Sequence, residues 1–330
     1  MKNTIKKSRT GAANKPPLPF EFQDQVMWAA WLYFVDEWTQ SQIAKKIGIS
    51  RVTVIKLLNE AKTRGLVSIQ ISPKVAAHTT TSRKLAEIFS LNAVTIIPDL
   101  KGEPLVPRLG KAGAFALAET LEKDDIIGIA WGRTVLAVAE AISLSEPIEN
   151  LTVAQITGSP NGLSADFSPE SCSSLLANNL GARNVKLLAP AMVSNPELRD
   201  MLLKEASIKK QFSVIRSANR ILFGVGDVGR ESTLRNSDLH TQKAVDKLVT
   251  NGAIAAIIGR FIDADGNELA LPNQNRMIGT NLDEMRKIPH RLCVAGGPIK
   301  VKSIIAALKG GFATDLVIDQ ATAEYIVKLS

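Results

Sequence analysis

Seven short apolar segments between residues 93 and 319 constrain the fold of this 330-residue chain most strongly. They read AVTIIP, IIGIAWG, TVAQITG, RILFGVGDVG, AIAAIIGRF, RLCVAGG and DLVID. Helical patterns such as AGAFALAETLEK, TVLAVAEAI and KVKSIIAALKGG lie between several of them. Continuous apolar strands that alternate with helices are typical of a parallel sheet covered by helices on both faces. The sequence therefore predicts a doubly wound, mostly parallel α/β domain for the larger part of the chain.

The ends of these apolar segments indicate where a ligand would bind. Glycines follow five of the segments, and ligands of open parallel sheets bind beyond the carboxyl ends of the strands. In GIAWGRTV, residues 128–135, Gly-Arg-Thr comes directly before a helical pattern. The helix N-terminus that begins near Thr134 favours an anion, and Arg133 adds a fork of hydrogen-bond donors. Lys300 falls in the first turn of another helix, where a cation is unfavourable unless an anion binds beside it, although a lysine that points to solvent stays an alternative.

The net charge of +8 is concentrated near the start of the chain. Residues 1–72 carry 11 Lys and Arg against five Asp and Glu, a net charge of +6, while the other 258 residues carry only +2. A basic segment on a nearly neutral body suits a polyanion such as DNA, although a solvated basic tail has the same composition.

The segment TQSQIAKKIGISRVTVIKLL has the spacing of a helix-turn-helix. We expect a first helix over residues 40–47, a corner at Gly48, and a second helix that Ser50 caps and that runs to about Thr63. The upstream segment FQDQVMWAAWLYFVDEW predicts a third helix. Its Trp28 and Trp31 are expected to join the helical core rather than to stack on bases. Beyond the second helix, LVSIQIS alternates like a strand and would make the unit winged.

The exposed N-terminal end of the second helix is where a recognition helix meets the major groove. Arg51 is expected to contact a guanine edge in bidentate fashion, and the lysines of both helices to contact phosphates. The residues expected to contact DNA are Gln40, Lys45, Lys46, Ser50, Arg51, Thr53 and Lys56. A helical hairpin that never contacts DNA is the alternative.

Three other patterns favour plainer interpretations than they first suggest. GVGDVG, residues 224–229, matches a dinucleotide-binding motif, but RESTLRNSDLHTQ follows it without clear helical spacing, so a loop that lines another ligand is the better interpretation. DADG, residues 263–266, resembles the opening of a calcium loop, but the further acids are missing and a tight turn is expected. The three histidines are scattered and show no pairing with a nucleophile.

The cysteines and the termini bound the class of protein. Cys172 and Cys293 match no metal spacing, no apolar run is long enough to span a membrane, and the first residues lack a signal-peptide pattern. We therefore expect a cytoplasmic protein that binds neither a metal nor a cofactor.

The motifs together carry a family resemblance. The helix-turn-helix, GIAWGRTV, QITGSP, GRFIDADGNEL and VAGGPIKVKSIIAALKGGFATDLVIDQATAEYIV resemble the SorC family of sugar-binding transcriptional regulators from about residue 24 to residue 330. The resemblance implies a winged helix-turn-helix joined to an effector domain like sugar-phosphate isomerases and deaminases. It also implies a homo-oligomer, typically a tetramer, whose operator affinity responds to a phosphorylated sugar.

The resemblance also assigns the effector-binding residues. It implies a phosphate on Gly132, Arg133 and Thr134, with Lys300 completing the charge neutralisation after Gly296 and Gly297. It further implies that five residues line the sugar end: Gln155, Gly158, Gly224, Gly226 and Asp263.

The expected organisation follows from the patterns and the resemblance together. We expect a basic disordered arm over 1–20, the winged helix-turn-helix over 21–72, a linker over 73–84, and the effector-binding and oligomerisation domain over 85–330. The function expected is regulation of a carbohydrate or polyol catabolic operon. A sugar-phosphate isomerase or deaminase is the alternative, but no general base beside the sugar can be argued from the sequence. A body that only assembles subunits is a third possibility, which the glycine loops disfavour.

Overall fold

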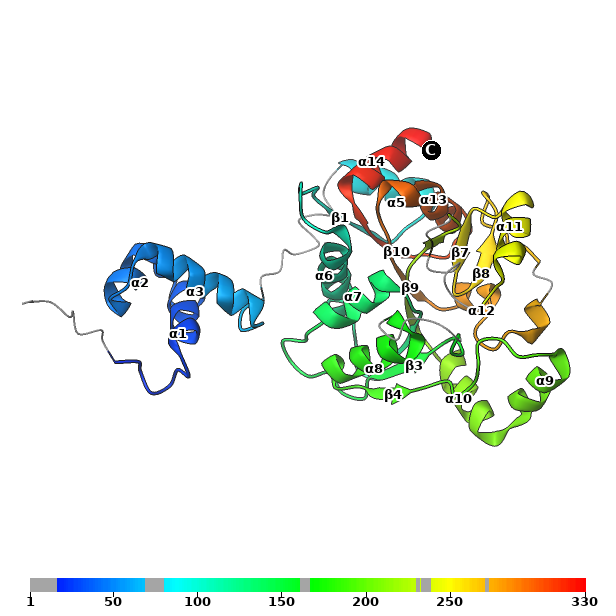
Figure 1. Cartoon of the computed structure of the whole chain (residues 1–330), viewed down its shortest axis with the longest axis horizontal. Coiled ribbons are helices and arrows are strands. Elements are labelled where there is room, and N and C mark those ends of the chain that lie inside the picture. The colour runs from blue at the N-terminus through cyan, green and yellow to red at the C-terminus, as the bar shows by residue number, and fades with distance from the viewer. Residues whose placement is uncertain (1–16, 69–79, 161–166, 230–231, 233–238, 271–272) are drawn as a thin grey trace, which may run out of the picture. The chain divides into compact units, whose positions relative to one another are not determined.

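The computed structural model describes residues 17–68, 80–160, 167–229, 232, 239–270 and 273–330. The chain divides into two compact units, residues 1–70 and residues 71–330 (Figure 1). The described residues of the smaller unit form three helices: α1 (Gln25–Phe34), α2 (Gln40–Ile47) and α3 (Arg51–Thr63). Within the described residues, none of the helices has the length and apolarity needed to cross a bilayer.

Local hydrogen bonds define the corner between α2 and α3. Thr39 and Gln42 form a capping box at the start of α2, and Gly48 ends α2 with a φ of 75°. The Ser50 hydroxyl then accepts the Thr53 N–H and begins α3. The structure confirms the expected bounds of both helices, because each signal acts within three residues of the chain.

The three helices pack around Trp28, Ile43, Ile47 and Val54, which are all buried. The prediction that Trp31 joins this core is wrong, since its side chain is 49% exposed. The centroid of the Trp31 ring lies 6.1 Å from that of Phe22, which packs against the core.

The structure bears on two expected boundaries of the smaller unit, the end of the arm and the strand of the wing. Leu18, placed in the arm by the sequence, packs against the three-helix core. The strand expected at 66–72 falls mostly within residues 69–79, outside the described part of the chain.

A seven-stranded parallel sheet forms the centre of the larger unit (Figure 1). Its strand order is β1-β10-β9-β5-β2-β3-β4, and every pairing is parallel. The strands of this sheet are β1 (Ala93–Ile97), β2 (Ile126–Ile129), β3 (Thr152–Gln155), β4 (Arg183–Val185), β5 (Arg220–Phe223), β9 (His290–Val294) and β10 (Asp315–Asp319). The chain winds outward in opposite directions from β2 and β5, so a topological switch point lies between these two strands.

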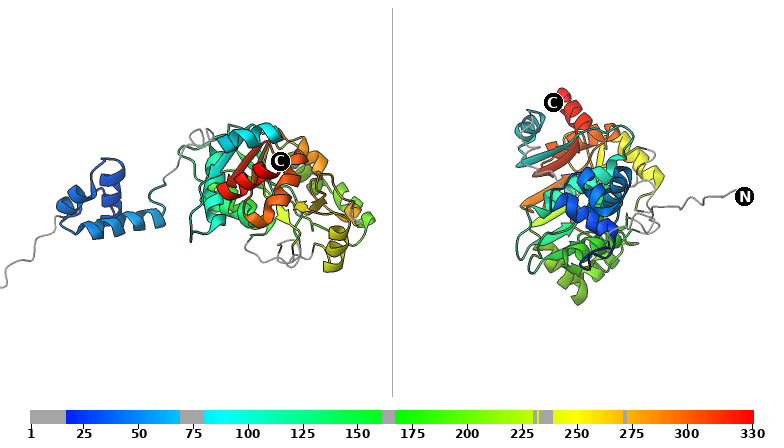
Figure 2. Two further views of the ribbon diagram at one scale, coloured as in Figure 1. Left: turned by 90° about the horizontal axis from the view of Figure 1, so that it is seen from above. Right: turned by 90° about the vertical axis from the view of Figure 1, so that its left-hand side faces the viewer.

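Helices cover both faces of this sheet, as expected for a doubly wound fold (Figure 2). Leu222 of β5 packs with the helices of one face, while its neighbours Ile221 and Phe223 pack with those of the other. The first face carries α6 (Leu105–Ala118), α7 (Arg133–Ala141) and α8 (Pro169–Leu180). The second face carries α5 (Thr80–Phe89), α10 (Ala206–Arg216), α13 (Val301–Lys309) and α14 (Gln320–Leu329).

Two details differ from the sequence predictions. Helix α5 begins at Thr80, so the last residues of the expected linker belong to the larger unit. The apolar segment AIAAIIGRF forms a hairpin, β7 (Ala255–Ile257) and β8 (Arg260–Ile262), which joins β6 (Gly226–Asp227) in a small antiparallel sheet. The remaining described elements are α9 (Pro196–Lys204), α11 (Gln242–Thr250), α12 (Leu282–Arg286) and the 3-10 turns η2 (Gln274–Arg276) and η3 (Pro298–Lys300).

Candidate functional site

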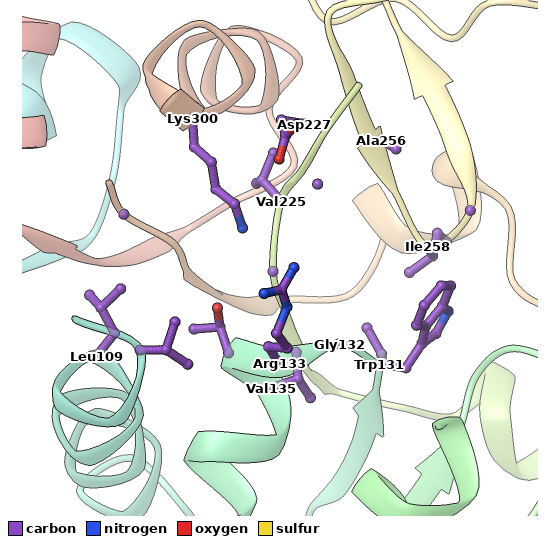
Figure 3. Close-up of a pocket in the computed structure, with 17 residues that line it drawn as sticks. Leu109, Trp131, Gly132, Arg133, Val135, Val225, Asp227, Ala256, Ile258 and Lys300 are labelled. Carbon is purple, nitrogen blue, oxygen red and sulfur yellow. The ribbon is translucent and has the colours of Figure 1, made fainter. Parts of the chain in front are cut away.

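A cavity of about 230 Å³ lies beyond the carboxyl ends of β2, β5 and β9, at the switch point of the sheet (Figure 3). Three glycine loops follow these strands and form its floor. The tip of the β7–β8 hairpin and the start of α6 complete its walls. The residues that line the cavity include Trp131, Gly132, Arg133, Thr134, Gly224, Gly226, Asp227, Ile258, Gly296 and Lys300.

The N-terminus of α7 opens onto this cavity. Gly132 caps the helix with a φ of 122°, a backbone conformation that favours glycine, and it provides no side-chain cap for the first turn. The first-turn N–H groups of a helix have no acceptor within the helix, and the helix dipole adds partial positive charge there. This end of α7 is therefore suited to an anion, as the sequence indicated.

Two cations reach the same space from opposite walls. Arg133 and Lys300 point toward one another across the cavity, from α7 and from the turn η3 before α13 (Figure 3). Burial lowers the pKa of Lys300 from its ordinary value, and the positive charge of Arg133 lowers it further. The carboxylate of Asp227 acts in the opposite direction and raises the pKa of Lys300. A bound anion would stabilise the positive charge that these two side chains bring to the cavity.

The loop that carries Lys300 is held in place from below by Asp319. The N–H of Gly297 donates to Asp319 Oδ1 at 2.8 Å and to Thr322 Oγ1 at 2.9 Å. A Cβ on Gly296 would lie 2.2 Å from the same Asp319 oxygen, so only glycine fits there. Asp319 also caps α14, which ties the loop to a buried helix end.

The smaller unit presents a second candidate surface on α3. Arg51, Thr53 and Lys56 are exposed along its first two turns, and Lys45 and Lys46 are exposed on α2. Arg51 Nε donates to Gln40 Oε1 at 3.1 Å, and this bond orients the guanidinium while it leaves the two terminal nitrogens of the fork for another acceptor.

The structure adds two observations about the residues expected to contact DNA, at Ser50 and at Val52. The Ser50 hydroxyl contacts both the N–H and the hydroxyl of Thr53. The Ser50 hydroxyl that was expected to contact DNA is therefore already engaged in capping α3. Val52, which sequence reasoning missed, is 63% exposed on the same face. An exposed apolar side chain at this position of a recognition helix can contact a thymine methyl group.

Comparisons with known proteins identify the family of this chain. The family model described as "Putative sugar-binding domain" matches residues 73–328. The chain is 32% identical to the uncharacterized transcriptional regulator YjhU of Escherichia coli K12 over 313 residues, covering 92% of this chain and 94% of that protein. It is 30% identical to the deoxyribonucleoside regulator of Bacillus subtilis 168, covering 91% of this chain and 96% of that protein.

The chain belongs to the SorC/DeoR family of sugar-binding transcriptional regulators. Its fold matches the full-length sorbitol operon regulator SorC of Klebsiella pneumoniae with a TM-score of 0.76 at 24% identity, covering 92% of this chain and 97% of that one. Like its relatives, this SorC/DeoR-family member is a transcriptional regulator, with an effector domain of the "Putative sugar-binding domain" family.

The structure brings most of the effector residues expected of a SorC/DeoR-family member into one cavity. Seven of them line it: Gly132, Arg133, Thr134, Gly224, Gly226, Gly296 and Lys300. Gly297 lies directly beside them and positions the loop through Asp319. The GVGDVG segment contributes loop and strand β6 to the wall, in agreement with its interpretation as a ligand-lining loop.

Gln155, Gly158 and Asp263 are not among the residues that line this cavity. The Gln155 side chain is fully buried and donates to the Thr157 carbonyl. Gly158 is required for a close backbone approach, since a Cβ there would lie 2.5 Å from the Pro190 oxygen.

The expected role of Asp263 is corrected by its contacts. Asp263 Oδ1 accepts the N–H groups of Asp265 and Asn267, each at 2.9 Å, which closes the DADG turn as a tight turn. This turn packs beside Gly310 at the C-terminal end of α13, whereas Lys300 precedes the N-terminal end of that nine-residue helix. At 1.5 Å per residue the two ends are about 13 Å apart, too far for Asp263 to share the site.

Asp227, Trp131 and Ile258 are among the lining residues that sequence reasoning missed. Asp227 supplies its carboxylate, and Trp131 and Ile258 form an apolar wall (Figure 3). Trp131 and Asp227 lie inside GIAWGRTV and GVGDVG, so their position after a strand was an available signal. Ile258 had no such signal, because it comes from the turn of a hairpin that was expected to be one strand.

Proposed function

We propose that this regulator binds operator DNA through α3 and that a phosphorylated sugar in the cavity sets its operator affinity. The observation that carries the effector half is the convergence of Arg133 and Lys300 near the glycine-capped N-terminus of α7 (Figure 3). A phosphate group offers three acceptor oxygens and a charge of nearly −2, which suits two cations and a row of N–H groups. Asp227 would accept a hydrogen bond from a sugar hydroxyl on the same wall.

The names of relatives support a carbohydrate or polyol operon as the target. The relatives include a deoxyribonucleoside regulator and, by fold, a sorbitol operon regulator. Titration calorimetry with phosphorylated sugars and polyols tests the effector half directly. Saturable heat without turnover supports a sensor, and the absence of binding by every phosphorylated ligand contradicts the proposal.

The DNA half makes a separate prediction. Replacing Arg51 with alanine should weaken operator binding by about 1–3 kcal/mol and relax the preference at one base pair, because a bidentate guanine contact is lost. Replacing Lys46 should instead weaken binding to all sequences alike and reduce the slope of affinity against salt concentration by about 1. Fluorescence anisotropy on operator and scrambled DNA measures both effects.

Lys247→Ala is the control. Lys247 is exposed on α11 of the larger unit, so its replacement should leave DNA binding unchanged. The recognition helix is misassigned if Arg51→Ala retains the operator affinity and footprint of the wild type.

We also propose that the regulator acts as a homo-oligomer, as a tetramer by analogy with its family. One helix-turn-helix covers a single half-site, and two-fold dimers contact half-sites about one helical turn or a multiple apart. Light scattering at micromolar concentration should therefore give a mass that is a multiple of 35.6 kDa. A monomer with and without DNA would contradict this.

A further inference from the structure

The tip of the β7–β8 hairpin has an unusual residue for its backbone conformation. Ile257 pairs with Arg260, so Ile258 and Gly259 form a two-residue turn with φ values of 47° and 80°. Turns of this kind favour Asn-Gly, since both positions need a positive φ. A β-branched residue in the left-handed region is a genuine outlier, and such strain is typical of ligand sites.

The strained residue Ile258 lies in the wall of the effector cavity. Ile258 is only 7% exposed, and it lines the effector cavity together with Trp131 and Ala256, on the side away from Lys300 (Figure 3). Trp131 and Ile258 also line a small second cavity of about 10 Å³, whose other walls include Thr157 and Arg260. The two side chains therefore form an apolar partition between the effector cavity and a small space behind it that is lined mostly by apolar side chains.

The apolar partition faces the end of a ligand that lies away from Lys300. With an anion at Arg133 and Lys300, the ligand's opposite end lies against Trp131, Ala256 and Ile258. These side chains offer that end neither a donor nor an acceptor, apart from the indole N–H, so a hydroxyl there loses water without gaining a full set of partners. The polar acceptor of the cavity, Asp227, lies on the wall near Lys300 instead.

From these contacts we infer that Ile258 is a specificity-determining residue that selects an effector with a deoxygenated carbon in the part of the sugar remote from its phosphate. The inference rests on the proposed phosphate site and adds the chemical class of the ligand. The strained turn is retained because the residue that suits the turn, asparagine, would expose a polar amide to this end of the effector and weaken the selection.

Matched ligand pairs test the inference. Calorimetry compares 2-deoxyribose 5-phosphate with ribose 5-phosphate, and 2-deoxyglucose 6-phosphate with glucose 6-phosphate, on the full-length protein. The members of each pair differ by one hydroxyl far from the phosphate. Wild type should prefer the deoxy member of the pair it binds by about tenfold, the usual effect of one unpartnered polar group. Ile258→Asn should reduce this ratio to about one or reverse it.

Ile258→Leu is the matched control, because it keeps an apolar side chain and removes the β-branch. It should retain the wild-type ratio, and thermal unfolding should find it at least as stable as the wild type. An unchanged ratio in Ile258→Asn, or a wild-type preference for the hydroxylated member, overturns the inference and leaves the phosphate site standing. Binding of none of the four ligands overturns the phosphate site and the inference together.

Discussion

Replacing Lys300 with methionine should weaken binding of a phosphorylated effector by about tenfold to a hundredfold. Methionine keeps the length of the side chain but removes one charge-assisted hydrogen bond to the phosphate, worth about 1.5–3 kcal/mol. Operator binding without effector should persist, since Lys300 lies in the larger unit and α3 in the smaller one. The decisive measurement is operator affinity against effector concentration for wild type and Lys300→Met.

Lys302→Met is the matched control, because Lys302 is exposed on α13 and does not line the cavity. Its titration curve should coincide with that of the wild type. If the Lys300→Met curve coincides as well, Lys300 is not part of the effector site. A ligand without phosphate that acts equally well would remove the phosphate from the proposal.

The lowered pKa of Lys300 adds a second readout to the same pair of variants. Above that pKa the free protein holds a neutral lysine, so binding of an anion must take up a proton, and effector affinity falls as the pH rises. The window runs from the lowered pKa of Lys300 up to the ordinary lysine value of 10.5. Lys300→Met should abolish this pH dependence.

The lowered pKa of Lys300 affects the stability of the fold in the opposite direction from its effect on effector affinity. In this window the unfolded chain binds more protons at Lys300 than the ligand-free folded chain, so the free energy of unfolding rises with pH.

Replacing Asp125 with alanine should lower the free energy of unfolding of the larger unit by about 3–5 kcal/mol. Asp125 and Arg220 form a buried ion pair at the amino ends of β2 and β5, at the opposite edge of the sheet from the effector cavity. Asp125 also accepts from the Asn219 side chain at 2.6 Å and from the Glu122 N–H at 2.7 Å. Its removal leaves a buried guanidinium without its counter-charge, which is far costlier than the loss of the bond itself.

Urea unfolding followed by far-UV circular dichroism measures this loss. The control is Lys123→Ala, which breaks an exposed ion pair with Glu149 nearby and should change stability by less than about 1 kcal/mol. The double variant Asp125→Leu, Arg220→Met should recover part of the loss, because apolar residues of similar volume avoid the uncompensated charge. Equal unfolding midpoints for Asp125→Ala and Lys123→Ala would contradict the expected role of the ion pair.

The sequence by itself determined the features that depend on neighbouring residues. The bounds of α2 and α3 follow from Thr39, Gly48 and Ser50, whose capping bonds reach only a few residues along the chain. The parallel sheet and its glycine-lined edge follow from apolar strands that alternate with helices, since such strands must be covered on both faces. For the same reason seven of the cavity-lining residues could be named in advance.

Tertiary structure alone decided which polar and apolar residues share the site. Asp227 and Asp263 both follow apolar strands and look equivalent in the sequence. The antiparallel pairing of β6 with β7 places Asp227 in the cavity wall, whereas Asp263 closes a turn at the far end of α13. Pairings between distant segments carry no local signal in one sequence. The burial that shifts the pKa of Lys300 and the strained turn that brings Ile258 beside Trp131 depend on the same long-range packing.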